Sequence, residues 1–354
     1  MNGMITYYIV IILIIFMTIL SQVGKEDNKK IIYKFFSILT ACILIIVSGL
    51  RWCVGTDYGN YIFSYSRRKE EWLFSLINFD EPGIGILAKI GSFIYDDYVS
   101  MFFLVAVVTI GLCVWIISKY SNNFVFSMLI YIFIGAWHNS FNGIRQYAAA
   151  AIIFAGHRYI YDRKFLRYLL VIVCAMLFHK TALVMLPVYF VANKKITFKT
   201  ILFLIIGVVI IRFSYDYLFS IMSFLKGTDQ SEYAYMQSNV NPLRIAVTFA
   251  PIFVALFIKT RLKMTKEIEF YLNLSLINAI LMFATSGSAY LARVGIYTEL
   301  FLTLLYPRLL KFFNKDSQKI FVILVLLFYF IYWHHEVSVR DSLNNFRWIF
   351  ERNY

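Results

Sequence analysis

Charge, proline and cysteine are all scarce in this sequence of 354 residues. Only 15% of the residues are Asp, Glu, Lys or Arg, whereas a soluble domain carries roughly 25%. The 5 prolines and 16 glycines exclude a collagen-like or linker-rich chain. The 4 cysteines show no Cys-x-x-Cys spacing, so the sequence indicates neither a zinc site nor a disulfide framework. Because 60% of the residues are hydrophobic, a water-soluble enzyme and a disordered chain are both excluded.

The abundant apolar residues are arranged in long blocks, such as Ile5–Leu20, Val99–Ile117 and Ile320–Trp333. Blocks near 20 residues match a bilayer core about 30 Å thick. The first block lacks a basic start and a small-residue cleavage site, so Met4–Val23 is predicted to be a retained helix and not a signal peptide. We therefore expect an all-α, polytopic integral membrane protein whose helices form a bundle.

Hydropathy predicts about twelve membrane spans. They cover residues 4–23, 31–50, 98–118, 124–138, 143–161, 165–178, 181–192, 199–219, 243–259, 267–286, 291–311 and 319–334. The pair 165–178 and 181–192 is short, and two interpretations stay open for it. Either two tight helices cross the membrane around His179 and Lys180, or the chain re-enters without crossing, which requires protein or water to cover its backbone.

Most basic residues lie in short loops next to the apolar segments. The loops rich in Lys and Arg are 24–30, 119, 158–167, 193–199, 259–266 and 308–319. Alternate threading of the spans places all of them on one face, which is the positive-inside pattern of a cytoplasmic face. The net charge of +14 is therefore explained by the membrane topology and is not evidence of a nucleic-acid-binding groove. We predict that the N-terminus and the C-terminus both lie outside.

No internal repeat and no separate soluble domain is visible, so residues 1–354 are predicted to form a single transmembrane domain. Two longer connections fall on the outer face, at residues 51–97 and 220–242. The first has aromatic-rich pieces, Tyr58–Tyr65 and Trp72–Ile77, that resemble amphipathic interfacial helices. A third apolar piece, Gly85–Tyr95, is too short to span and is expected to meet the membrane edge.

Several charged side chains that hydropathy does not explain fall on this outer face. They are Arg51, Asp57, Arg145, His179 and Arg293. Most have a plain structural explanation, because an arginine at a helix end snorkels to the interface and an aspartate organises a turn. Arg145 differs, since Gln146 and small residues follow it within a span. A buried arginine costs roughly 2.5–3.5 kcal/mol in a membrane, so we expect an anionic partner for it.

Such a group of side chains suits the binding of an anion. Arginine forks bind phosphate oxygens bidentately, and two or three of them neutralise a diphosphate. A lipid-linked diphosphate is the natural anion at the outer leaflet. Asp57 or His179 is then a candidate general base toward a sugar hydroxyl. No Asp-x-Asp, His-x-His or His-Glu-x-x-His motif occurs, so we expect no metal and no cofactor.

Short motifs around these residues follow one another in a characteristic order. They are Gly49–Tyr61, Asn142–Gln146 with the alanine-rich run after it, Tyr159–Tyr161, Phe178–Leu183 and Leu291–Tyr297. In this order and spacing the chain resembles the EpsG family, the Wzy-like polymerases of bacterial exopolysaccharide and capsule, over roughly residues 30–310. The family often has Ser where Lys180 stands, so His179 is the stronger candidate of the two.

The resemblance implies a metal-independent membrane glycosyltransferase of GT-C-like architecture in the cytoplasmic (inner) cell membrane. The enzyme would join undecaprenyl-diphosphate-linked oligosaccharide repeats at the outer face, for exopolysaccharide, capsule or O-antigen. Its partners would include a flippase and chain-length regulator proteins.

The same resemblance implies roles for individual residues. Arg51, Arg145 and Arg293 would hold the departing diphosphate. His179 or Asp57 would take the acceptor proton, and we favour His179 as the base because its ordinary pKa suits that task. Asp57 would then orient Arg51 or a sugar hydroxyl. The further substrate-binding residues would be Tyr58, Tyr61, Asn142, Gln146 and Lys180.

Three other functions stay open. A flippase or exporter of lipid-linked oligosaccharide would also need cations for a diphosphate, and Arg212 inside the eighth predicted span favours it. A membrane O-acyltransferase of envelope sugars would need a catalytic cluster toward the cytoplasm, which the sequence does not show. A non-catalytic scaffold of a synthase complex is the third. The charged residues gather at one face, which favours the polymerase.

Overall fold

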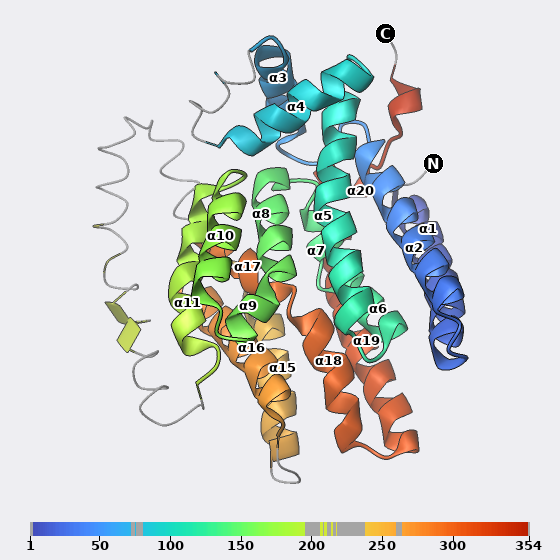
Figure 1. Ribbon diagram of the computed structural model, residues 1–354, viewed down its shortest axis with the longest axis vertical. Coiled ribbons are helices and arrows are strands. Elements are labelled where there is room, and N and C mark those ends of the chain that lie inside the picture. Colours follow the sequence, from blue (N-terminus) through green and yellow to red (C-terminus); the bar gives the residue numbers. More distant parts are fainter. Residues whose placement is uncertain are drawn as a thin grey trace.

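The structure, a computed structural model, is built from helices (Figure 1). It describes residues 3–71, 75, 81–194, 206–207, 209–210, 214, 217, 238–259 and 264–352. Within these ranges no strand forms, and an isolated β-bridge joins Arg51 to Trp348. The predicted all-α fold is confirmed for this part of the chain. Arg212, most of the loop 220–242 and most of the piece Trp72–Ile77 lie outside the described residues.

Five helices of the described part are long and apolar enough to cross a membrane. They are α1 (Gly3–Glu26), α2 (Lys30–Gly49), α5 (Tyr98–Tyr120), α16 (Lys266–Ala284) and α19 (Lys315–Ser338). Shorter apolar helices accompany them, namely α4 (Pro82–Ile94), α6 (Phe124–Phe133), α8 (Ile144–Ala155), α10 (Phe165–Met176), α11 (Met185–Val191) and α15 (Pro242–Lys259). The chain is thus a multi-pass membrane protein, while the number of twelve spans stays a prediction.

The outer helices turn apolar side chains away from the bundle. Ile12 and Phe16 of α1 are exposed, and so are Ile323 and Leu327 of α19. Their opposite faces bury residues such as Tyr7 and Tyr329 in one large core cluster. In water such apolar stripes would be unfavourable, whereas lipid tails accept them at no cost.

Three predicted spans are broken into shorter pieces. Span 124–138 becomes α6 and α7 (Ala136–Asn139), span 143–161 becomes α8 and α9 (His157–Tyr161), and span 291–311 becomes η3 (Leu291–Gly295), α17 (Ile296–Glu299), α18 (Leu302–Leu309) and η4 (Leu310–Phe312). The first break falls at Gly135, whose φ is +85° and where a Cβ would lie 2.9 Å from Asn139 Nδ2. Only glycine adopts this left-handed conformation without strain. Breaks within a membrane are tolerated where protein or a cavity covers the backbone.

The short pair 165–192 forms an antiparallel hairpin. α10 runs one way, the chain turns before η2 (Lys180–Val184), and α11 returns beside it. The Tyr168 hydroxyl donates a hydrogen bond to the carbonyl of Met185 at 3.1 Å. Asn273 Nδ2 on α16 donates to the carbonyls of Ala192 and Lys194 at 2.8 and 2.7 Å, so the chain comes back to the level of that helix. Two short crossings and a re-entrant segment both bring the chain back to the face where it began, so the number of crossings here stays a prediction.

The loops segregate to two ends of the bundle. In Figure 1 the turns α1–α2 and α18–α19 lie at the lower end, and both termini lie at the upper end. Hydrogen bonds tie the lower turns together, since Lys25 Nζ donates to the Ser121 carbonyl at 2.8 Å and Arg308 donates to the Tyr120 carbonyl at 2.7 Å. For the basic loops 24–30, 119 and 308–319 the predicted grouping at one end is therefore confirmed, and for the other basic loops it stays a prediction.

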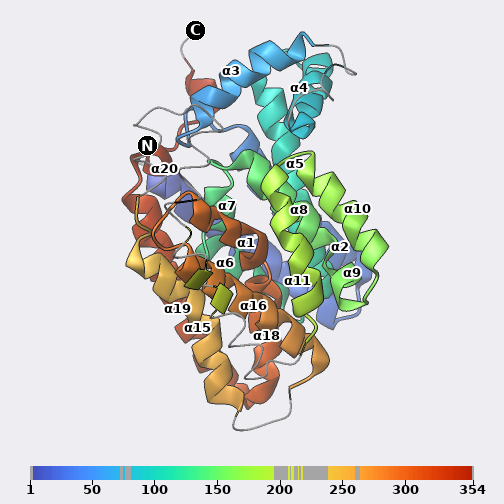
Figure 2. The ribbon, with the colours of Figure 1, turned by 90° about the vertical axis from the view of Figure 1, so that its left-hand side faces the viewer.

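The connection 51–97 folds into a cap at the other end. It contains α3 (Tyr58–Lys69) and α4, which lie above the bundle in Figure 2. The piece Gly85–Tyr95 forms most of α4, and Phe93 and Ile94 at its end are exposed. Exposed apolar residues at this position suit the membrane edge that the sequence predicts.

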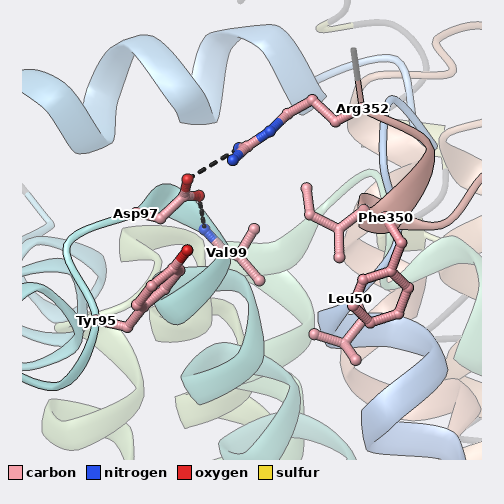
Figure 3. Close-up of a pocket in the computed structure, with 7 residues that line it drawn as sticks. Leu50, Tyr95, Asp97, Val99, Phe350 and Arg352 are labelled. Carbon is pink, nitrogen blue, oxygen red and sulfur yellow. Dashed lines mark hydrogen bonds and ion pairs between the residues drawn. The ribbon is translucent and has the colours of Figure 1, made fainter. Parts of the chain in front are cut away.

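The C-terminal segment after α19 holds this cap in place. It contains α20 (Asp341–Asn344) and η5 (Ile349–Glu351). The N–H of Trp52 donates to the Arg347 carbonyl, and the N–H of Ile349 donates to the Leu50 carbonyl, both at 2.8 Å. Figure 3 shows the next contact, the ion pair between Arg352 and Asp97 at 2.9 Å, at the rim of a cavity of about 480 Å³. Segments almost 300 residues apart in sequence are thus joined.

Candidate functional site

A cavity of about 590 Å³ opens at the capped end of the bundle, and we call it the arginine pocket. Three arginines line it, each from a different segment: Arg244 from α15, Arg293 from η3 and Arg340 from the turn before α20. The polar lining also contains the amides Asn139, Asn142 and Gln146, the hydroxyl residues Thr56, Tyr147 and Ser342, and one acidic residue, Asp341. Cations and amides around one hollow form a site for an anion that carries hydroxyl groups.

Neighbouring side chains fix the walls of the arginine pocket. Arg340 donates from Nη1 to Asn139 Oδ1 at 3.0 Å and also pairs with Glu336. Arg293 lies over the ring of Tyr290, 5.9 Å from its centroid, and its carbonyl accepts a hydrogen bond from Gln146 Nε2 at 2.9 Å. The arginines therefore face the pocket from anchored positions, which lowers the entropy lost on binding.

The loop before α3 forms another wall. The N–H of Thr56 donates to Asn142 Oδ1 at 2.6 Å. Gly55 has a φ of +111°, and a Cβ there would lie 2.8 Å from the carbonyl oxygen of Phe141. Because any side chain would push these two segments apart, the turn requires glycine at this position.

A second polar group meets the first turn of α8 at Arg145, and we call it the Glu81 cluster. It consists of Glu81, Arg145 and His179. Glu81 Oε2 pairs with Arg145 Nη1 at 2.6 Å, and Glu81 Oε1 contacts His179 Nδ1 at 2.7 Å. The N–H of Lys180 also donates to Glu81 Oε1, at 2.9 Å. Glu81 is thus the anionic partner that the sequence predicts for Arg145, although the sequence analysis did not identify it.

The electrostatics of the cluster keep Glu81 ionised. Burial alone would raise the pKa of its carboxyl, but the hydrogen bonds from His179 and Lys180 and the charge of Arg145 outweigh burial, so the pKa is lowered. An ionised carboxylate only accepts hydrogen bonds, so the proton between the two groups belongs to His179 Nδ1. The Nε2 atom of a neutral His179 then carries the free lone pair of a base.

The three side chains of the Glu81 cluster differ in the fraction of their surface that is exposed to solvent. The Glu81 side chain is only 9% exposed, whereas His179 is 22% and Arg145 is 41% exposed. The carboxylate therefore sits behind the histidine and the arginine and leaves both accessible to a ligand.

Arg51 is placed outside both groups. It is 1% exposed and donates from Nε to the Val54 carbonyl and from Nη2 to the Phe141 carbonyl, each at 3.2 Å. The rings of Phe102 and Phe141 lie 4.7 and 4.9 Å from the guanidinium carbon. These contacts fix the turn after α2, and Arg51 is not among the residues that line the arginine pocket.

The residues at the start of α3 also divide between the surroundings of Arg51 and those of Arg145. Tyr58 is buried, stacks on Phe102 at 4.6 Å and donates to the Arg51 carbonyl at 2.9 Å. Tyr61 and Asp57 lie instead within electrostatic range of Arg145. Asp57 precedes α3, and its side chain makes no capping hydrogen bond there.

The structure thus brings together some of the predicted site residues and adds others. Asn142, Gln146 and Arg293 line the arginine pocket, while Arg145, His179 and the backbone of Lys180 join the Glu81 cluster. Arg244, Arg340 and Glu81 were missed by the sequence analysis. Within the described ranges, no group of three or more His, Cys, Asp or Glu side chains is gathered for a metal ion.

Comparison with known proteins gives one match. The family model described as "EpsG family" matches residues 34–349, which is nearly the whole chain. No curated protein and no solved structure matches. Since the match includes both the arginine pocket and the Glu81 cluster, the chain belongs to the EpsG family, a family of polysaccharide polymerase-like membrane proteins.

Proposed function

We propose that this protein is a polysaccharide polymerase that joins undecaprenyl-diphosphate-linked oligosaccharide repeats at the outer face of the inner cell membrane. The observation that carries the proposal is the arginine pocket, where Arg244, Arg293 and Arg340 from three segments line one cavity. Membership of the EpsG family supports the same substrate class. A twelve-span bundle of GT-C-like architecture belongs to the proposal as well.

In the proposed reaction the arginine pocket holds the diphosphate of the donor. The hydroxyl oxygen of the acceptor sugar attacks the anomeric carbon, and the bond from that carbon to the diphosphate breaks. The electron pair leaves with the diphosphate, whose growing charge the three guanidinium groups stabilise. Asn142 and Gln146 are then placed to bind sugar hydroxyls or phosphate oxygens.

The acceptor proton goes to His179. Its Nδ1 is held by Glu81 at 2.7 Å, which leaves Nε2 as the accepting atom. The negative charge of Glu81 also stabilises the imidazolium that forms. The Glu81 cluster and the arginine pocket share the first turn of α8, since Arg145 belongs to one and Gln146 to the other. Asp57, near Arg145, is assigned the orienting role.

The distribution of charge supports an enzyme over a flippase. A transporter places polar groups near the membrane midplane in both halves of the fold. In the part of the chain that the structure describes, the arginine pocket and the Glu81 cluster both lie toward the capped end, where the connection 51–97 begins and ends. The basic loops occupy the opposite end, which the positive-inside rule assigns to the cytoplasm.

Deletion and complementation test the proposed function. Cells that lack the gene should make no long polymer and should accumulate the single lipid-linked repeat. The native chain and the Arg167→Lys variant should restore long chains on a gel, because Arg167 is exposed on α10 at the basic end. The Arg293→Lys variant should restore little. Normal polymer length in deleted cells would contradict the proposal.

Labelling of cysteines from outside intact cells tests the proposed orientation. Cys53 is exposed in the turn after Arg51, so it should react with a membrane-impermeant maleimide. A cysteine at position 27, introduced as Asp27→Cys in the α1–α2 turn, should react only after the cells are broken. The reverse labelling pattern would show that the topology is inverted. The arginine pocket would then not face the side of the membrane where the proposed substrate lies.

A further inference from the structure

A carboxyl group lies just behind the wall of the arginine pocket. Glu299 ends α17, one helical turn after Ile296, which lines the pocket. Its Oε1 accepts a hydrogen bond at 2.8 Å from the hydroxyl of Tyr147, which also lines the pocket. A carboxylate inside a membrane bundle is unfavourable, so its presence calls for a function or a partner.

The groups that face Glu299 come from five helices. They are Cys113 of α5, Tyr131 of α6, Tyr147 of α8, Arg244 of α15 and Tyr332 of α19. Among them Arg244 is the cation that attracts the Glu299 carboxylate. No direct ion pair to Glu299 is formed within the described residues, so Arg244 acts on it through space. The other four groups are neutral in their ordinary state.

Two other carboxylates near the sites, Glu336 and Glu81, are held by direct ion pairs. Glu336 forms a direct ion pair with Arg340 and accepts a hydrogen bond from Asn241 Nδ2 at 3.2 Å. Glu81 receives two hydrogen bonds besides its ion pair with Arg145. Both therefore have a direct ion-pair partner, which Glu299 lacks within the described residues. The charge of Glu299 depends much more on one cation, Arg244. An anion that binds in the arginine pocket would compete with Glu299 for that cation.

We propose that Glu299 is the resident counter-ion of Arg244 and takes up a proton when the diphosphate of the lipid-linked substrate binds in the arginine pocket. The inference rests on the proposed function. An entering diphosphate draws Arg244 to itself and brings negative charge close to Glu299. Both changes disfavour the carboxylate, so it accepts a proton from solvent. When the diphosphate product leaves, the proton leaves and Glu299 again neutralises Arg244, which keeps the product from staying bound.

Proton uptake on binding tests the proposal directly. Undecaprenyl diphosphate is titrated calorimetrically into the full-length protein in lipid nanodiscs, at pH 7 and in two buffers of different ionisation enthalpy. The difference between the two heats gives the protons taken up per diphosphate. Because the diphosphate itself titrates, the measured quantity is the difference between the native chain and Glu299→Gln. The native chain should take up more protons than the variant, up to one per diphosphate, as linkage requires of one additional titrating group.

Glu336→Gln is the matched control, because Glu336 forms its direct ion pair with Arg340 and acts on Arg244 less strongly than Glu299 does. It should take up as many protons as the native chain. Equal proton uptake by the native chain and Glu299→Gln would overturn the inference while leaving the proposed function intact. A native chain that binds no diphosphate would overturn the proposed function itself.

A measurement on the native chain alone keeps the inference testable if Glu299→Gln does not fold. Deprotonation of the free diphosphate makes it a stronger anion, so on its own it would raise the affinity as the pH rises. Proton uptake by Glu299 acts in the opposite direction. We expect the Kd of undecaprenyl diphosphate to rise between pH 7 and pH 8.5. A constant or falling Kd over this range would overturn the inference.

Discussion

The arginine pocket and the Glu81 cluster use the same kind of side chain for different tasks. In the arginine pocket three guanidinium groups from distant segments line a cavity of about 590 Å³. In the Glu81 cluster a single arginine is clamped 2.6 Å from a carboxylate that also holds a histidine. In the first arrangement the guanidinium groups line a cavity that a ligand can enter, and Arg340 also pairs with Glu336. In the second the charge of Arg145 helps to keep Glu81 ionised. The partner of an arginine, more than its presence, thus decides its role.

Loss of the base in the Glu81 cluster should have the largest effect. We expect His179→Gln to lower kcat by about 10²–10⁴-fold, the usual contribution of a general base. The change leaves the arginine pocket untouched, so the Kd of undecaprenyl diphosphate should stay the same. The matched control is His335→Gln, since His335 is exposed on α19.

Polymerisation rates of the purified variants in lipid measure this prediction. A His179→Gln variant with more than about a tenth of the native rate would remove His179 from the chemistry. Asp57→Asn should be tested beside it, because an inactive Asp57→Asn with an active His179→Gln would make Asp57 the base.

Neutralising the orienting carboxylate should have the next largest effect. Glu81→Gln still offers an oxygen to His179 Nδ1 but loses the charge, and charge-assisted hydrogen bonds contribute roughly 1.5–3 kcal/mol. We expect kcat to fall about 10- to 100-fold with a smaller change in KM. Rescue by Glu81→Asp would distinguish a requirement for charge from a simple loss of packing. If Glu81→Gln changed only KM, Glu81 would act on binding and not on His179.

Exchange of arginine for lysine sharpens the contrast between a pocket arginine and a buried one. Arg293→Lys keeps the charge and loses the bidentate fork, so KM should rise about 10- to 100-fold with normal amounts of folded protein. Arg51→Lys should instead lower the melting temperature and leave the KM of the folded fraction unchanged, because its donors go to carbonyls of the chain. The opposite pattern would place Arg51 in the site, as the sequence analysis expects.

The smallest expected effect is a loss of folding stability in acid, which follows from the lowered pKa of Glu81. A carboxyl whose pKa is lower in the folded state stabilises that state above its unfolded pKa, about 4.3, and loses this contribution as the pH falls through the folded value. The melting temperature of the native chain should therefore exceed that of Glu81→Gln at pH 7, and the gap should narrow below about pH 4. A gap that is constant with pH would mean that Glu81 is not ionised.

The predictable part of the fold is the part that follows from local composition. Apolar blocks and basic loops identified the helices and their grouping at two ends, because lipid imposes both rules on each segment separately. The break at Gly135 carries a local signal too, but its effect depends on the nearby Asn139 side chain. The antiparallel hairpin 165–192 needed the distant contact from Asn273 to be recognised.

The candidate site was predictable only for residues that stand in recognisable motifs. Glu81 lies 64 and 98 residues from its partners Arg145 and His179, so no local sequence pattern predicts the pairing. Its signal was weak: an acidic residue before Pro82, at the start of an apolar helix. Arg244 and Arg340 stand at span ends, where an arginine is usually an interfacial anchor.

Arg51 is the opposite case, because the sequence predicts it in the site and the structure places it outside. Its position at the end of a span matches that of a substrate-binding arginine, and only the carbonyls of Val54 and Phe141 reveal that its donors are used within the chain. A guanidinium has the same sequence signal whether its partner is a phosphate or a backbone oxygen.

Polymerisation by the purified protein is the most direct test of the central claim. The full-length chain in lipid nanodiscs is incubated with the undecaprenyl-diphosphate-linked repeat alone, and the products are separated by length on a gel. The account predicts a ladder of chains that differ by whole repeats, with release of undecaprenyl diphosphate for each bond formed. It also predicts that Arg293→Lys and His179→Gln extend the ladder much more slowly than Arg167→Lys does when the substrate concentration is below the native KM. Substrate that stays a single repeat with the native chain, while it crosses the membrane of sealed vesicles, would contradict the account.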